Sequence, residues 1–176
     1  MNDVIRTIME RRSIRRFKPE EIPHEVLREI LKAGLYAPNG MGKQAVITVA
    51  VTDKETRDWL SELNRKIGGW KEGFDPFYGA PVILAVLAEK EHFTGLYDGS
   101  LVLGTMMLAA QSLGVGSIWI HRAKEEFETE EGKALLDKLG IQGEYVGIGH
   151  CALGYPEGDL PVPAPRREGR VFYTEK

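Results

Sequence analysis

Four arginines lie within seven residues near the N-terminus, in the stretch RRSIRRF at residues 11–17. A guanidinium group presents its N–H donors in a fixed fork, which suits paired, charge-assisted hydrogen bonds to a phosphate. If the stretch is extended, successive side chains alternate, so that Ser13 and Arg15 point to one side. Ile14 and Arg16 then point to the other side. The stretch predicts either an anion-binding site or a solvent-exposed basic turn between two helices.

Two glycine-rich stretches are further candidates for binding phosphate or a dinucleotide. APNGMGKQ, at 37–44, is not a P-loop, because Ala37 stands where that motif needs glycine and Gln44 where it needs serine or threonine. GIGHCA, at 147–152, matches the loose dinucleotide pattern, but its glycines lie inside a strand-like run and do not open a helix. Glycines inside a strand more often mark the close approach of another backbone or of a flat ligand. That second interpretation is the one we adopt for 147–152.

The sequence gives little support for metal binding by histidine or cysteine, or for a catalytic serine. The four histidines and Cys151 show no metal-ligand spacing, and the chain contains no G-x-S-x-G nucleophile elbow. A surface position or a satisfied polar contact is therefore expected for each histidine, and no metal site is expected. These residues are His24, His92, His121 and His150.

Length, net charge and composition limit the classes of protein to which this chain can belong. The 176 residues carry a net charge of −3, which gives no overall attraction to nucleic acid or to anionic membranes. A single cysteine rules out an internal disulfide and fits a reducing compartment. The N-terminus lacks the apolar core of a signal peptide, and the apolar-rich stretch at 100–114 is shorter than a membrane span. We expect a cytoplasmic protein without nucleic-acid or membrane partners.

The helices and strands that position these residues are predicted from the spacing of the apolar residues. Helices are expected at 3–12 with Asp3 as N-cap, at 23–34 with Gly34 as the stop, at 54–69, at 97–114 and, in one or two pieces, at 125–140. Strands are expected at 45–51, 80–88, 115–120 and 145–155. The class is mixed α and β, and no composition change marks a domain boundary.

Five stretches, in this order, resemble the FMN-dependent nitroreductase family: RRSIRRF, LKAGLYAPNGMGKQ, YGAPVILAVLA, YDGSLVLGTMMLAAQSLGVGSIWI and VGIGHCALGYPEG. The similarity covers essentially the whole chain. It implies an α+β fold whose central, mostly antiparallel sheet is flanked by helices. It also implies one FMN-binding domain over 1–176, with 156–176 as an extended C-terminal tail, and an intertwined homodimer that holds one FMN at each of two subunit interfaces.

The resemblance also implies residues for the phosphate end of FMN, and it favours phosphate binding over the basic turn. The phosphate and ribityl chain would be held by the arginine stretch and by two arginines that close over them from the C-terminal end: Arg11, Arg12, Ser13, Arg15, Arg166 and Arg167. Arg16 would be a surface or interface charge.

The ring end of the flavin is implied to meet three other segments. A loop from the partner subunit would contribute Pro38, Asn39, Gly40 and Gln44, although Gly42, Ala45 and Val46 depart from the family pattern S-x-x-N-x-Q-P-W. The ring would lie against Ile118, Trp119, Ile120 and His121, mostly through their backbone, with His121 alternatively a bystander on the outer face. Asn64 matches an asparagine near the pyrimidine edge, and an exposed helix residue is the alternative.

The activity implied by the resemblance is that of an FMN-dependent NAD(P)H oxidoreductase. It would reduce nitroaromatic or quinone-type acceptors by ping-pong hydride transfer through flavin N5, with no side chain as catalytic group because the flavin carries the chemistry. Alternatives are a flavin enzyme of the same fold with different chemistry, such as reductive dehalogenation, and a non-catalytic flavin-binding or regulatory module. A domain without flavin, whose arginines bind another anion, is the remaining alternative.

Overall fold

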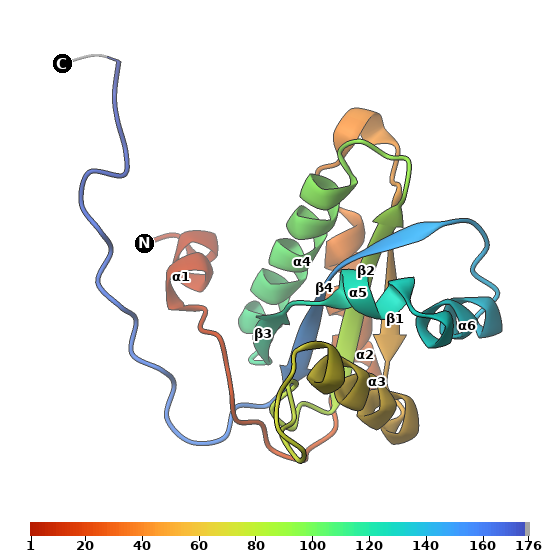
Figure 1. Cartoon of the computed structure of the whole chain (residues 1–176). Coiled ribbons are helices and arrows are strands. Elements are labelled where there is room, and N and C mark those ends of the chain that lie inside the picture. Colours follow the sequence, from red (N-terminus) through yellow and green to blue (C-terminus); the bar gives the residue numbers. More distant parts are fainter. Residues whose placement is uncertain (175–176) are drawn as a thin grey trace.

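An antiparallel sheet of four strands lies at the centre of the computed structural model, which describes residues 1–174. The strands are β1 (Val46–Val51), β2 (Val82–Glu89), β3 (Gly116–Ile120) and β4 (Tyr145–Gly154), in the order β1-β2-β4-β3 (Figure 1). The central strands β2 and β4 are buried along almost their whole length, as the uninterrupted apolar run of β2 predicts for that strand. The α+β class and the four strands expected from the sequence are confirmed.

Helices cover both faces of this sheet. They are α1 (Asp3–Glu10), α2 (His24–Leu35), α3 (Lys54–Ile67), α4 (Gly95–Ser112), α5 (Ala123–Glu128) and α6 (Glu130–Lys138), with a 3-10 turn, η1, at Gly40–Gly42. One core lies under α2 and α4, where Ile30 and Met106 are fully buried. The other core lies under α3, α5 and α6, where Leu60 and Phe127 pack against the sheet. The sheet is therefore the middle of three layers (Figure 1).

Two predicted helix ends are wrong in detail. Asn2, not Asp3, caps α1, because its side-chain oxygen accepts a hydrogen bond from the Val4 N–H at 2.9 Å. Gly34 does not end α2 but lies inside it, buried against α4. A β-carbon there would lie 2.8 Å from Cγ of Met106, so this glycine allows the two helices to approach closely.

The strict alternation predicted for the arginine stretch is also wrong. Ser13 forms a parallel bridge with Ser117 on β3, and Phe17 forms an antiparallel bridge with Pro156. Between these two bridges the chain follows no regular strand, and Ile14 and Phe17, which strict alternation would place on opposite sides, pack into the same core. Pairing at only two points leaves the intervening residues free to turn, so the alternation is not kept from one bridge to the other.

The glycines of β4 mark close approaches, as expected. A β-carbon on Gly147 would lie 2.2 Å from the backbone of Ala123 at the start of α5, and one on Gly149 would lie 2.8 Å from the Trp119 ring. Both positions therefore require glycine so that neighbouring elements can pack onto the strand.

The C-terminal segment leaves the body of the molecule. Residues 157–174 contain no helix or strand and follow an extended path outside α1 (Figure 1). Within residues 1–174, none of the helices combines the length and apolarity that a membrane crossing needs.

Candidate functional site

The arginine stretch lies along the edge strand β3. The Ile14 N–H donates to the Ser117 carbonyl at 3.0 Å, so Ser117 directs its backbone outward from the sheet. Because backbone direction repeats every second residue, Trp119 directs its N–H and C=O to the same edge. In the described part of the chain, nothing pairs with this edge beyond Ser117. The edge therefore offers backbone donors and acceptors next to the arginines.

Arg11 is the arginine whose position best suits a bound anion. Its guanidinium is half-buried, and its Nη1 atom is buried without a hydrogen-bond partner among residues 1–174. The Ser117 Oγ atom is likewise buried and unpartnered within that range. Burial raises the pKa of the Cys151 thiol to about 12, and the charge of Arg11 opposes this rise. Buried donors without partners are unfavourable, so these atoms fit a ligand that carries oxygen acceptors.

The other arginines of the stretch have different surroundings. Arg12 donates to the carbonyl oxygens of Met9 at 2.7 Å and of Pro161 at 3.2 Å, so it ties the C-terminal tail to α1. Arg16 pairs with Glu157 at 3.1 Å on the exposed surface, in agreement with the surface charge expected for it. Arg15 is exposed beside the same edge. The four arginines thus differ in their partners, because Arg12 and Arg16 bond other parts of the chain.

The turn from β3 to α5 follows directly on this edge. Ile118 and Ile120 are buried in the core under α3 and α5, while Trp119 packs on the opposite face. His121 is exposed, and Arg122 has a φ of 80°, a left-handed conformation that side chains seldom adopt. A ligand on this edge would therefore meet the backbone of Trp119, whereas Ile118 and Ile120 direct theirs towards β4.

Arg122 is held by an aromatic ring. Its guanidinium lies 4.1 Å from the centroid of the Trp70 ring, in a cation–π arrangement. A β-carbon on Gly68 would lie 2.7 Å from that ring and 2.9 Å from Nε of Arg122, so the end of α3 must be glycine for this stack to form.

Asn64 is fully buried, so the exposed-residue alternative is wrong. Its amide nitrogen donates to the His121 carbonyl at 3.0 Å and to a carboxylate oxygen of Glu126. The other carboxylate oxygen of Glu126 contacts Nε2 of His150, and both of these residues are also fully buried. This buried polar cluster, Asn64–Glu126–His150, joins α3, α5 and β4 behind the turn.

Sequence reasoning missed Glu126, and it treated His150 only as a satisfied polar contact. Glu126 lies in an acidic stretch, EEFETEE, whose members all look solvent-exposed, and 62 residues separate it from Asn64. The one available signal of its burial is helical periodicity, because Glu126 lies three residues after Ala123 and next to Phe127, and all three are buried in the short helix α5.

The loop at 38–44 is anchored elsewhere, at the start of α4. The Gly40 N–H donates to both carboxylate oxygens of Asp98, at 3.1 and 3.0 Å, and Thr94 and His92 bond the same carboxylate. Burial opposes ionisation of Asp98, but the bonds from Gly40, Thr94 and His92 outweigh it and lower its pKa. A β-carbon on Gly40 would lie 2.2 Å from Oγ1 of Thr94, so only glycine fits there.

Other residues of this loop are less constrained. Asn39 accepts a hydrogen bond from the Gln44 N–H at 2.9 Å, whereas the side chains of Pro38 and Gln44 are exposed. The loop therefore presents an ordered backbone and an open outer surface.

The predicted site residues fall into separate groups. Residues 11–15, Asn64 and 118–121 come together at the β3 edge, next to the C-terminal end of α4. Residues 38–44 lie at the other end of that helix, whose 18 residues span about 27 Å. Arg166 and Arg167 lie on the extended tail, both exposed. One chain by itself therefore does not bring all the predicted residues to one ligand.

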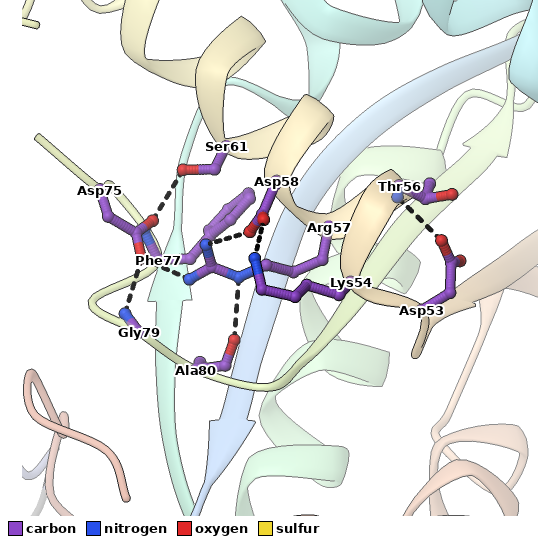
Figure 2. A network of polar contacts seen from close by, with 10 residues as sticks. All are labelled: Asp53, Lys54, Thr56, Arg57, Asp58, Ser61, Asp75, Phe77, Gly79 and Ala80. Carbon is purple, nitrogen blue, oxygen red and sulfur yellow. Dashed lines mark hydrogen bonds and ion pairs between the residues drawn. The ribbon is translucent and has the colours of Figure 1, made fainter. Parts of the chain in front are cut away.

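A second polar network on α3 stands apart from these residues. Arg57 pairs with Asp75 and donates to the Ala80 carbonyl at 3.0 Å, while Ser61 donates to Asp75 at 2.7 Å (Figure 2). Burial opposes ionisation of Asp75, but Arg57, Ser61 and the Gly79 N–H outweigh it and lower its pKa. The network braces the loop that leads into β2.

Comparison with known proteins gives the family. The family model described as Nitroreductase family matches residues 8–155. The chain is 31% identical over 186 residues to an NADPH-flavin oxidoreductase of Vibrio harveyi, covering 99% of this chain and 74% of that protein. It is 30% identical over 188 residues to an FMN reductase (NAD(P)H) of Bacillus subtilis, with 94% and 70% covered.

Solved structures agree with these sequence matches. A nitroreductase with bound FMN from Bacteroides fragilis superposes with a TM-score of 0.92 at 30% identity, covering 99% of this chain and 100% of that one. A nitroreductase with bound FMN from Desulfitobacterium hafniense has a TM-score of 0.89 at 27% identity, with the same coverage. With its fold and most of its length matched in this way, the chain belongs to the nitroreductase family.

Proposed function

We propose that this chain is an FMN-dependent NAD(P)H oxidoreductase that reduces nitroaromatic or quinone-type acceptors. The observation that carries the proposal is the Nη1 atom of Arg11, a buried charged donor without a hydrogen-bond partner among residues 1–174. Membership of a family whose solved members include FMN-bound nitroreductases supports FMN as the ligand. When bound, FMN would accept hydride from NAD(P)H and pass it to the acceptor.

The residues of the β3 edge fit the two ends of FMN. Arg11, Ser13 and Arg15 would hold the phosphate and ribityl chain, because guanidinium groups bind phosphate through paired charged hydrogen bonds. The backbone of Trp119 and His121 would lie against the ring and orient it. Arg12 would contribute less directly, since its Nε and Nη1 groups already bond backbone carbonyls.

A homodimer would complete the site. The apolar side chains of α1 point into solvent in the single chain, each more than half exposed: Val4, Ile5, Ile8 and Met9. The loop at 38–44 is about the length of α4 away from Arg11, so a partner subunit would have to supply Pro38, Asn39, Gly40 and Gln44. The extended tail would likewise carry Arg166 and Arg167 to the partner's site. Exposed apolar area of this kind is typical of an interface.

The domain and its setting complete the proposal. Residues 1–176 would form one FMN-binding domain, with 156–176 as its extended C-terminal tail, of which residues 175 and 176 lie outside the described part of the chain. The enzyme would work in the cytoplasm, where the buried thiol of Cys151 stays reduced.

Titration of the apoprotein with FMN tests the proposal, with Arg11→Ala and its matched control Arg16→Ala. We expect Arg11→Ala to weaken FMN binding by about tenfold or more, because a charged hydrogen bond contributes about 1.5–3 kcal/mol. Arg16→Ala should bind FMN as the wild type does, since Arg16 pairs with Glu157 in solvent. Equal affinity in all three proteins would contradict phosphate binding by Arg11.

Turnover is tested on the loaded protein. Anaerobic addition of NADPH or NADH should bleach the flavin absorbance, and an acceptor should restore it with ping-pong kinetics. A spectrum that persists with both nucleotides would favour a non-catalytic flavin-binding module instead.

A further inference from the structure

We propose that Glu126 is a positioning residue for the β3–α5 turn, acting on its backbone through Asn64. The inference rests on the proposed function, in which this turn lies against the flavin ring. Glu126 itself would touch neither flavin nor substrate, because it is fully buried behind the turn.

The bonding of Glu126 shows that its carboxylate is fully engaged. One oxygen accepts a hydrogen bond from the Asn64 amide, and the other contacts Nε2 of His150. The rings of Phe77 and Phe127 close around His150, with centroids at 5.4 and 6.5 Å from that of its ring. A buried acid in apolar surroundings is tolerated only when its oxygens are bonded, so the cluster must keep this geometry.

Asn64 is the link between Glu126 and the turn. Both partners of its amide nitrogen, the Glu126 carboxylate and the His121 carbonyl, are acceptors. The NH2 group must therefore face them, which settles the orientation of the amide. Each of its two N–H bonds serves one partner, so a shift of Glu126 would pull on the His121 carbonyl.

The turn itself needs such support. Arg122, the residue after His121, has a φ of 80°, a conformation that persists only where neighbouring contacts hold it. The Trp70 stack holds its side chain, and the Glu126 N–H bonds its carbonyl at 3.0 Å. Glu126 thus restrains the turn twice, through its own backbone and through Asn64.

The test uses full-length protein and three variants. Glu126→Leu removes both acceptors at similar volume, whereas Glu126→Gln keeps an acceptor for Asn64 and offers an N–H to a neutral His150. Asp75→Asn is the control, because it weakens the other polar network on α3. Backbone hydrogen exchange at 121–124 in the apoprotein and the FMN dissociation constant are measured for each.

For Glu126→Leu we expect exchange at 121–124 and the FMN dissociation constant each to rise by about tenfold or more. Glu126→Gln should restore both to within about threefold of wild type, since the role is one of hydrogen bonding. Asp75→Asn should lower the melting temperature while leaving both readouts at their wild-type values. If Glu126→Leu does not fold, Glu126→Asp replaces it, because the shorter carboxylate cannot span both partners and should give an intermediate rise.

The outcomes separate the two proposals. A wild-type protein that binds no FMN overturns the proposed function and this inference with it. Wild-type FMN affinity in Glu126→Leu, or in Glu126→Asp with faster exchange at the turn, overturns the positioning role alone. Equal loss of affinity in Asp75→Asn also overturns it, because the effect would then be one of general stability.

Discussion

Helix α3 carries two polar networks that differ in their access to water. Towards its N-terminal end, Arg57 and Ser61 bond Asp75, whose side chain is 31% exposed (Figure 2). Towards its C-terminal end, Asn64 bonds Glu126 in a cluster with no exposed area. Partial exposure lets water replace a lost partner, whereas full burial does not. The first network therefore braces a loop tolerantly, while the second fixes the site turn in one geometry.

Removing His150 should separate the two networks most strongly. His150→Phe keeps a ring between Phe77 and Phe127 but leaves the Glu126 carboxylate with one side-chain partner. Breaking a buried pair in this way costs about 3–5 kcal/mol, which urea denaturation would measure as a lower free energy of unfolding. A loss below about 1 kcal/mol would show that the Glu126–His150 contact contributes little to stability.

The partly exposed network should respond less, and in a pH-dependent way. Asp75→Asn is expected to lower the free energy of unfolding at pH 7 by about 1–3 kcal/mol, because it weakens charged hydrogen bonds from Arg57 and Ser61. The pKa of Asp75 is lowered in the folded state. Its stabilisation is therefore present above the unfolded-state pKa of about 3.9 and is lost as the pH falls through the folded-state pKa.

Thermal unfolding between pH 7 and pH 2 measures this difference. The stability gap between wild type and Asp75→Asn should close on acidification. A gap that stays constant over this range would mean that ionisation of Asp75 contributes nothing.

The smallest effect is expected at the turn that the buried cluster holds. Arg122→Gly removes a left-handed strain of roughly 1–2 kcal/mol but also removes a cation–π contact of about 0.5–2 kcal/mol. The two changes oppose each other, so the free energy of unfolding should change by no more than about 1.5 kcal/mol. A larger loss, measured by urea denaturation, would show that the Trp70 stack rather than Asn64 holds the turn.

A comparison of β4 with the arginine stretch shows which local structure the sequence predicts correctly and which it does not. The apolar run and internal glycines of β4 predicted a buried strand with close neighbours, and Ala123 and Trp119 are those neighbours. The arginine stretch was expected to alternate strictly, but Ile14 and Phe17, which are three residues apart, both pack into one core. Local periodicity describes a continuous strand well and a segment paired at two points poorly.

The sequence by itself determined the helices and strands, the α+β class, the family resemblance and the segments of the candidate site, because apolar spacing and glycine positions act over a few residues. Only the tertiary structure decided which of these segments meet. It separated residues 38–44 from Arg11 by the length of α4, and it brought Glu126 to Asn64 across 62 positions. An acidic residue in a charged stretch shows no local sign of burial, since its partners come from α3 and β4 only once the core has formed.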